Sequence, residues 1–359
     1  MAPTEILANQ HFKVISNLLA PYDIKVKLMT GSSAKNTKNN SADDFNVLIG
    51  THSLLNEKAK YDKLGLIIID EQQRFGVEQR ETLRKKGYNP HLLAMTATPI
   101  PRTIALTMYG ELDMSILTDM PMGIRKIKTW VVPEEKRSKA YEWIGKNGRK
   151  VFIVCPLIEE SETLGTVRAV KMEYLKLIKI FKSKKVGLLH GKMAAKEKEE
   201  TLSKFRNDKL DILVSTPVVE VGIDIPEANI MVIEGADRFG LSQLHQLRGR
   251  IGRAGQDAYC LLFTDITVEF AIRRLKSLET TFLGPKLAEI DLALRGPGEI
   301  LGFKQHGFVK FKAARFSDTE LIRKTKETAV KIALIESWES FPEMTDFIAK
   351  LTKIETVSN

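Results

Sequence analysis

Short apolar runs that alternate with amphipathic stretches constrain the fold of this chain more than any other feature of its sequence. Each run is rich in leucine or β-branched residues, ends in a polar or glycine-containing segment, and precedes a helix-like stretch. The runs are Phe45–Ile49, Leu64–Ile69, Leu92–Met95, Val151–Val154, Val186–Leu189, Ile212–Val214 and Ile230–Ile233. Such runs are typical of buried parallel strands joined by crossover helices. The sequence therefore predicts an α/β fold.

This pattern is interrupted twice along the chain. Around Met120–Gly123 the alternation of strands and helices stops, and it resumes at Trp130–Val132. After Thr264 the strand-like runs end, and the remaining sequence is helix-like apart from the Arg295–Gly298 segment. Proline and glycine at such points favour linkers and turns. We therefore predict a first α/β domain over 1–124, a second over 125–265 and a helical region over 266–359.

Composition narrows the class of partner and compartment. Lys and Arg number 55 against 45 Asp and Glu, a formal net charge of +10. A basic surplus suits a polyanionic partner such as nucleic acid, although the surplus alone is weak support. The N-terminus has no signal-peptide pattern, and the apolar runs are too short to cross a bilayer. Cys155 and Cys260 lie in apolar runs and are expected to be buried free thiols, as in a reducing cytoplasm.

Two adjacent carboxylates follow the apolar run Leu66–Ile69. A buried strand would deliver Asp70 and Glu71 to its C-terminal end, the edge at which open α/β sheets bind ligands. One carboxylate can hold Mg²⁺ through water, and its neighbour can orient and deprotonate an attacking water. An isolated Asp-Glu pair is more often a solvated turn. The neighbouring segments favour a functional pair here.

One of these segments is Met95–Thr103, in which Thr96, Ala97 and Thr98 precede two prolines. Hydroxyl groups at a strand end can contact both the carboxylates and a bound nucleic acid, and so couple the two. The alternative is that the threonines only cap the next helix.

A second segment, Gln243–Gly255, carries Arg250 and Arg253 among three glycines. Residues three apart on one helical turn face the same way, so both guanidinium groups would point to one place. Two permanently charged planar groups suit the charge that develops on a transferring phosphoryl group. The alternative is a solvated basic helix, but glycines at this density disfavour an ordinary helix.

These motifs together resemble the superfamily-two helicases, and the longer strings resemble the RecG family of DNA branch-migration helicases. The resemblance covers nearly the whole chain. It rests on Ala2–Ala8, Asp70–Val77, Ala97–Thr103, Leu157–Ser161, Val214–Pro226, Gln246–Arg250 and Asp291–Glu299. It implies two tandem RecA-like α/β domains with parallel sheets, followed by a C-terminal helical hairpin element. It also implies ATP and Mg²⁺ as cofactors and duplex or branched DNA as the partner of a monomeric protein.

The resemblance assigns roles residue by residue. Asp70 is the Mg²⁺ carboxylate, Glu71 activates water, and Arg250 and Arg253 are arginine fingers. The remaining positions fall into three groups. The nucleotide-contacting group is Gln73, Gly222, Asp224 and Gln246; the DNA-backbone group is Pro3, Thr4, Glu5, Thr30, Gly31, Thr51 and His52; the group that couples ATP turnover to movement on DNA is Thr96, Ala97, Thr98, Arg295 and Gln305.

Several positions depart from the family pattern. Gln73 stands where the family commonly has His, and Ala293 where it has an acidic residue; Phe303 and His306 are also unusual. A glutamine can still donate a hydrogen bond to a phosphate or to the coupling segment. We therefore expect altered tuning at Gln73, and Ala293 removes an acidic side chain that the family has in the coupling hairpin.

The largest departure is that no Gly-x-x-x-x-Gly-Lys-[Ser/Thr] loop occurs in these residues. The resemblance implies such a loop, and a DNA-gripping wedge domain, before the Ala2–Ala8 motif. We therefore expect a fragment of a longer protein, with Met1 an internal residue and the first domain the less stable one. The alternatives are a non-catalytic DNA-binding fragment or truncated paralogue, and the translocase part of a transcription-repair coupling factor.

Overall fold

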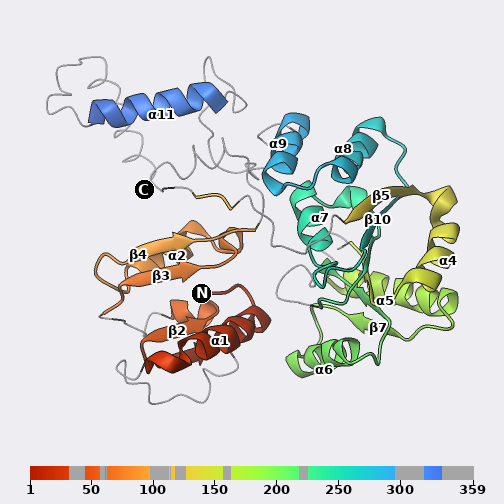
Figure 1. The fold of residues 1–359 in the computed structure, drawn as a ribbon, viewed down its shortest axis with the longest axis horizontal. Coiled ribbons are helices and arrows are strands. Elements are labelled where there is room, and N and C mark those ends of the chain that lie inside the picture. The colour runs from red at the N-terminus through yellow and green to blue at the C-terminus, as the bar shows by residue number, and fades with distance from the viewer. Residues whose placement is uncertain are drawn as a thin grey trace. The chain divides into compact units, whose positions relative to one another are not determined.

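The computed structural model describes residues 1–31, 45–56, 61, 63–97, 113, 115–117, 127–156, 163–217, 225–295 and 319–333 (Figure 1). The chain divides into two compact units. One is Met1–Pro99 with Thr118–Ala288, and the other is Ile100–Leu117 with Glu289–Asn359. The first unit contains both predicted α/β domains, and all of their strand pairs are parallel. The predicted fold class, two tandem RecA-like domains with parallel sheets, is confirmed.

The described part of the first domain contains two pairs of parallel strands. Strand β1 (Val26–Met29) pairs with β2 (Val47–Gly50), and β3 (Leu66–Ile69) pairs with β4 (His91–Ala94). Strand β1 is missing from the predicted runs because Lys27 interrupts its apolar pattern and all four of its residues are only half-buried. The helical elements here are α1 (Glu5–Leu19), η1 (Ala20–Tyr22), η3 (His52–Leu55), η4 (Gln72–Arg74) and α2 (Val77–Arg84).

The first two residues join the two strand pairs. The backbone N–H of Ala2 donates to the Gly50 carbonyl at 2.8 Å, at the end of β2. The N-terminal amine donates to the Ile68 carbonyl at 2.7 Å, and the Met1 carbonyl accepts from the Asp70 backbone N–H at 3.0 Å. Residues 1 and 2 therefore hydrogen-bond to both β2 and the end of β3.

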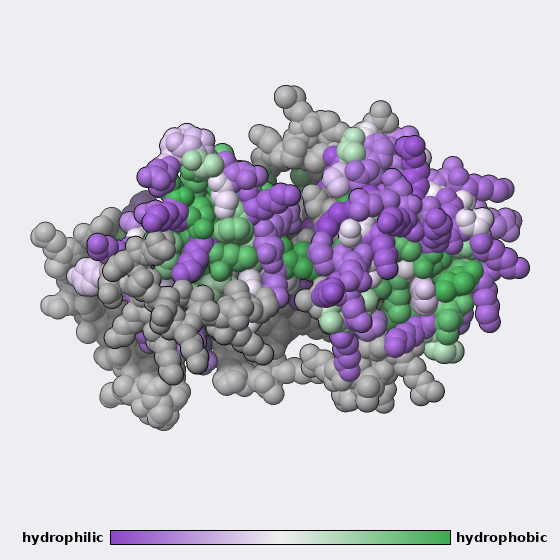
Figure 2. Space-filling model, turned by 90° about the horizontal axis from the view of Figure 1, so that it is seen from below, coloured by the Kyte–Doolittle hydropathy of each residue, from purple (hydrophilic) through white to green (hydrophobic). Residues whose placement is uncertain are grey.

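Only one face of the β3–β4 pair is covered by described residues. Ile67 and Ile69 point into a core with Leu54, Phe75 and Leu83. The opposite face carries apolar side chains that are 38% to 54% exposed: Leu66, Ile68, Leu93 and Met95. Apolar side chains also reach the surface among hydrophilic ones on the face shown in Figure 2.

The second domain is a six-stranded parallel sheet in the order β5-β10-β9-β6-β8-β7. Three central strands are buried along their whole length: β6 (Val151–Val154), β8 (Ile212–Ser215) and β9 (Ile230–Ile233). The others are β5 (Lys128–Pro133), β7 (Val186–Leu189) and β10 (Tyr259–Thr264). Burial on both faces explains why these runs are continuously apolar. Cys155 and Cys260 are buried free thiols in this core, as predicted, and burial raises the pKa of both.

Helices connect these strands and cover the sheet (Figure 1). They are η5 (Glu134–Lys136), α4 (Arg137–Asn147), α5 (Thr163–Ile180), α6 (Ala195–Arg206), η8 (Ala236–Arg238) and α7 (Leu241–Arg248). Both α5 and α6 pack beside the edge strand β7.

Helix α8 (Glu269–Thr280) is fastened to the second domain by two buried arginines. Arg248, from α7, donates to the carbonyls of Leu278 and Thr281 at 2.7 and 3.1 Å. Arg274, from α8, donates in the opposite direction, to the carbonyls of Asp237 and Phe239 at 2.6 and 2.8 Å. These bonds satisfy buried backbone acceptors and hold α8 against both α7 and η8.

Helix α8 also covers the edge of the sheet. The Glu279 carboxylate accepts from the backbone N–H of Val131 at 2.8 Å, so this edge-strand donor is satisfied by a side chain. Two further helices are described, α9 (Gly284–Arg295) and α11 (Thr319–Ala333). None of the helices among the described residues is long and apolar enough to span a membrane. The predicted domain boundaries stay predictions.

Candidate nucleotide and nucleic-acid sites

Strand β3 ends at the predicted carboxylate pair. Glu71 adopts a left-handed backbone conformation with φ of 51°, which is costly for a residue other than glycine. Its side chain is 8% exposed. The turn therefore holds the Glu71 carboxylate beneath the surface directly after the strand.

The Asp70 carboxylate is fixed by two hydrogen bonds. Its Oδ1 accepts from the Glu71 backbone N–H at 2.9 Å, and its Oδ2 lies 2.9 Å from Nε2 of His11 on α1. The hydrogen bond from His11 lowers the pKa of Asp70, and partial burial opposes it. Asp70 is therefore ionised at neutral pH. Sequence reasoning missed His11 because the two residues are 59 positions apart and no spacing pattern joins them.

This carboxylate fits the chemistry of Mg²⁺. Magnesium bound with a nucleotide usually takes one or two carboxylates and completes its shell with water and phosphate oxygens. Each carboxylate oxygen has two lone pairs, so the two hydrogen bonds of Asp70 leave one pair on each oxygen. No group of three or more His, Cys, Asp or Glu that could hold a metal is found in the described part of the chain. Asp70 therefore fits a magnesium ion that also takes ligands from a nucleotide.

A chain of side-chain hydrogen bonds connects Glu71 to the end of β4. Nε2 of Gln73 donates to Glu71 Oε2 at 2.6 Å, and Thr96 Oγ1 donates to Gln73 Oε1 at 2.8 Å. The predicted threonine therefore reaches the carboxylates through Gln73, and not directly. An amide is suited to this position because it donates and accepts at once.

The predicted DNA-backbone segments lie at one edge of the β1–β2 pair. Thr30 and Thr51 directly follow the two strands, whose ends are adjacent because Met29 is in register with Gly50. Thr4 caps the N-terminus of α1, where its Oγ1 accepts from the backbone N–H of Leu7 at 3.3 Å. Helix α1 packs on the same two strands, with Phe12 and Ile15 against this core.

The exposure of these residues is uneven. The side chains of Thr30 and Thr51 are buried, at 2% and 8% exposure, whereas Gly31 and His52 are exposed. A Cβ on Gly50 would lie 2.2 Å from the Met29 carbonyl oxygen, so only glycine allows β1 and β2 to approach this closely here. A ligand at this edge could therefore contact Gly31, His52 and the exposed backbone around them. The side chains of Thr30 and Thr51 are too buried to contribute as much.

The arginine segment differs from its prediction. Helix α7 ends at Arg248, so Arg250 and Arg253 lie beyond it and not on one helical turn. The expectation of a shared helical face was wrong because Gly252 and Gly255 adopt φ of +74° and +80°, which ends helical geometry. Arg250 is half-buried and Arg253 is exposed, with its Nε donating to the Gly249 carbonyl at 2.9 Å.

Other predicted residues lie in part or wholly outside the described residues. Gln246 is half-buried on α7, and Ala97 is exposed after Thr96. Arg295 is the last residue of α9, and its side chain is not described. Outside the described residues lie Thr98, Gly222, Asp224 and Gln305.

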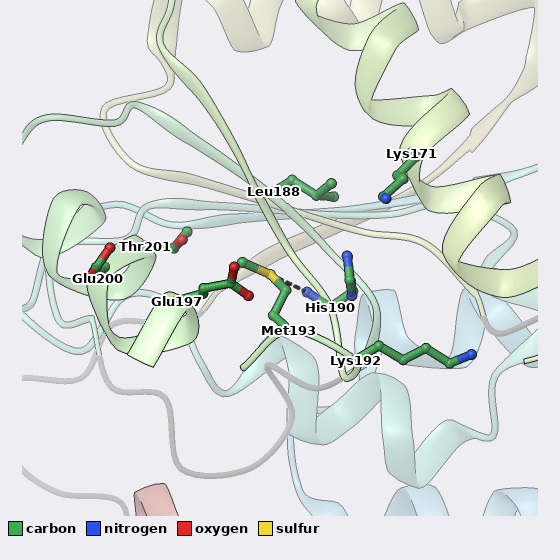
Figure 3. A pocket seen from close by; sticks show the side chains of 8 residues that line it. All are labelled: Lys171, Leu188, His190, Lys192, Met193, Glu197, Glu200 and Thr201. Carbon is green, nitrogen blue, oxygen red and sulfur yellow. Dashed lines mark hydrogen bonds between the residues drawn. The ribbon is translucent and has the colours of Figure 1, made fainter. Parts of the chain in front are cut away.

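A hollow of about 490 Å³ lies at the end of β7, between α5 and α6 (Figure 3). Lys171, His190 and Lys192 contribute to its lining together with Glu197 and Glu200, and the His190 ring points toward Lys171. His190 is 8% exposed, and its Nδ1 has no hydrogen-bond partner among the residues described. Burial, and then the nearby lysine charges, lower the pKa of His190. The ammonium groups of Lys171 and Lys192 can contact an anion, and the carboxylates of Glu197 and Glu200 oppose its binding. Sequence reasoning missed this site because its residues come from two different elements.

Two family models match the chain. Residues 1–107 match the DEAD/DEAH box helicase family, and residues 135–255 match the helicase conserved C-terminal domain. The first match contains strands β1 to β4, and the second contains strands β6 to β9 of the six-stranded sheet.

Individual relatives agree with these matches. The chain is 47% identical over 334 residues to the ATP-dependent DNA helicase RecG of Aquifex aeolicus, and this match covers 89% of the chain and 42% of the relative. It is 42% identical to RecG of Bacillus subtilis, covering 96% of this chain and 52% of that protein. A solved structure of RecG bound to a three-way DNA junction superposes with a TM-score of 0.68, at 41% identity, over 91% of this chain and 43% of the RecG chain. The chain spans about half the length of these relatives. It is a homologue of the helicase domains of the RecG family.

Proposed function

We propose that this chain supplies the motor domains of a RecG-type ATP-dependent DNA helicase that acts on branched DNA. The observation that carries the proposal is the carboxylate pair at the end of β3, fixed by His11 and Gln73, in a chain 42–47% identical to RecG helicases. The DNA junction bound by the related RecG structure supports branched DNA as the substrate class.

Asp70 would hold Mg²⁺, and Glu71 would orient and deprotonate the attacking water. When bound with ATP, Mg²⁺ neutralises phosphate charge. The Glu71 side chain is buried and hydrogen-bonded to Gln73, so its carboxylate is already fixed before any ligand binds. Arg250 and Arg253 would stabilise the charge that develops on the transferred phosphoryl group. Gly222, Asp224 and Gln246 stay predicted nucleotide contacts.

The edge of the β1–β2 pair would grip the DNA backbone. Helix N-termini and exposed backbone N–H groups bind phosphates, and Pro3–Glu5 lie at the start of α1. The hollow around Lys171, His190 and Lys192 would supply a phosphate contact on the second domain. These contacts do not read base edges, so we expect little sequence preference.

The Thr96–Gln73–Glu71 chain would link DNA occupancy to hydrolysis. A shift of the segment after β4 changes the donor to Gln73 and therefore the position of Glu71. Arg295 and Gln305 stay predicted coupling residues, whose replacement should uncouple unwinding from hydrolysis. We also expect a monomer in the cytoplasm.

A second candidate function is DNA binding without catalysis. It is favoured by one observation, the absence of a Gly-x-x-x-x-Gly-Lys-[Ser/Thr] loop in the 359 residues. That loop cradles the phosphates with backbone N–H groups, and its Lys and Ser or Thr contact phosphate and Mg²⁺.

One comparison separates the two functions. DNA-stimulated ATP hydrolysis is measured for this chain and for a longer form that includes a phosphate-binding loop upstream of Met1. We expect no turnover in the first and robust turnover in the second, abolished by Glu71→Gln. Turnover by the short chain that Glu71→Gln abolishes would mean that the nucleotide site is misplaced. Silence in both forms would favour the non-catalytic function.

A further inference from the structure

The contact between His11 and Asp70 joins two sites that were described separately. His11 lies on α1, seven residues after the N-cap Thr4, so it projects from nearly the same face of the helix. Asp70 follows β3, and its Oδ2 is 2.9 Å from His11 Nε2. The helix that begins in the candidate DNA segment therefore contacts the candidate magnesium carboxylate.

The hydrogen bond has a defined direction. An ionised carboxylate only accepts hydrogen bonds, so the Nε2 atom of His11 carries the hydrogen and donates. The second donor to Asp70, the Glu71 backbone N–H, approaches the other oxygen. Two donors on two different oxygens fix the rotation of the carboxylate and leave a lone pair on each oxygen for a further ligand.

His11 lies on a part of α1 that is anchored by packing against the core. Ala8, three residues before His11, is fully buried, and Ile15, four residues after it, packs on the core of the β1–β2 pair. The side chains of His11 and Asp70 are 34% and 23% exposed. The imidazole thus reaches Asp70 from a helix face that is anchored by packing, which limits how far the ring can move.

We propose that His11 is a positioning residue, which orients the Asp70 carboxylate for Mg²⁺ and ties it to helix α1. The inference rests on the proposed function, because it takes Asp70 as the metal carboxylate. Partners that orient metal-binding carboxylates typically change metal affinity by about 10- to 100-fold when they are removed. His11 itself contacts no ligand in this scheme.

Mn²⁺ is a suitable probe, because it prefers the same oxygen ligands as Mg²⁺ and broadens nearby NMR signals. The chain is labelled with ¹⁵N-glutamate, and the Glu71 amide is identified as the signal lost in Glu71→Gln. The Mn²⁺ concentration that broadens this signal by half is then measured. His11→Ala should raise that concentration about tenfold. His11→Gln, which keeps a hydrogen-bond donor at similar reach, should stay within about threefold of the unmodified chain.

Asn17→Ala is the matched control, since Asn17 is exposed on the same helix and should give the unmodified value. An unchanged value in His11→Ala, or equal losses in His11→Ala and His11→Gln, would overturn the positioning role. Asp70→Asn separates this failure from that of the proposed function. If Asp70→Asn abolishes broadening while His11→Ala does not alter it, only the positioning role fails. If Asp70→Asn has no effect, the magnesium assignment of Asp70 fails and the role of His11 fails with it.

Discussion

The two α/β domains use the same kind of strand but differ in how they hold their functional side chains. In the first domain, Asp70 and Glu71 are fixed by side-chain hydrogen bonds from His11 and Gln73. In the second, the exposed Arg253 follows the end of a helix in a glycine-rich turn. The β3–β4 pair leaves one apolar face exposed, whereas β6, β8 and β9 are buried throughout. The domain with the more deeply buried sheet thus carries an arginine in an exposed turn, and the more open domain carries carboxylates that side-chain hydrogen bonds already orient.

The sharpest way to break this comparison is to remove Arg253. In the longer form with a phosphate-binding loop, Arg253→Ala should lower the ATPase kcat by about 10³-fold, the scale for arginine fingers. Arg253→Lys should recover little of it, because an ammonium group cannot reproduce the planar guanidinium. DNA affinity, measured by fluorescence anisotropy, should be nearly unchanged. Normal turnover with lost DNA binding would instead assign Arg253 to DNA phosphates.

Matched core substitutions test the difference in packing. Ile69 and Ile153 are both fully buried, one in each domain. Ile→Ala at a buried site costs about 2–5 kcal/mol, depending on how well the site can collapse. We expect Ile153→Ala near the upper end and Ile69→Ala near the lower, since β3 is covered on one face only. Hydrogen exchange resolved by domain would measure both losses of unfolding free energy, and a larger loss at Ile69 would contradict this account.

Between pH 6.5 and 4, acidification should destabilise the second domain more than the first. Burial and the adjacent Arg248 lower the pKa of His245 to about 4, against about 6.5 in an unfolded chain. The unfolded state binds the proton more tightly than the folded state. The contribution of neutral His245 to the unfolding free energy is therefore complete above pH 6.5, and about 3 kcal/mol of it is lost as the pH drops to about 4. Asp70, whose pKa is also lowered, contributes stability that is lost only below its usual value of 3.8.

Denaturant unfolding from pH 7 to 4, followed separately for each domain, measures this order of loss. His245→Gln should flatten the pH dependence of the second domain alone. If the first domain lost stability before the second between pH 6.5 and 4, the burial of His245 would not control acid stability.

The smallest expected effect concerns DNA binding by the hollow around Lys171, His190 and Lys192. Duplex affinity should fall with salt, with a log–log slope of about −0.9 for each phosphate neutralised. Lys171→Ala should weaken binding similarly for all sequences and reduce the slope by about 1. Lys179→Ala, an exposed residue on the same helix, is the control and should leave the slope unchanged. An equal reduction in both variants would indicate that only overall charge matters.

The sequence was most informative about strands whose burial is continuous. The runs that become β6, β8 and β9 are apolar throughout, and the carboxylates directly after Ile69 lie at the end of a strand as predicted. Strand β1 was missed because Lys27 interrupts its apolar pattern. Its pairing with β2 is visible in the structure but not in its own composition. Strands with one exposed face, such as β3 and β4, were also predicted, because their runs are apolar throughout.

Contacts distant in sequence limited the prediction of the sites. Asp70 and Glu71 could be identified from their position, but His11 could not, because only the fold brings α1 beside β3. The prediction that Arg250 and Arg253 share a helical turn was wrong because Gly252 has a φ of +74°. A Cβ at this position would also lie 2.9 Å from the Cβ of Ala258. The sequence motifs identified these functional residues, but tertiary packing determines how their side chains are placed.

The hydrogen bonds of Arg248 and Arg274 constrain the two donor positions more than the positions that accept them. Each guanidinium donates to backbone carbonyls, which every amino acid provides. Substitutions at Leu278 or Thr281 that preserve the helix end would leave these acceptors in place, whereas no other side chain offers the five donors of an arginine. A chimaera that took α8 from a distant relative could thus keep the attachment with few matching residues. It would require that the two arginines, the carboxylate at position 279 and an apolar buried face of α8 be retained.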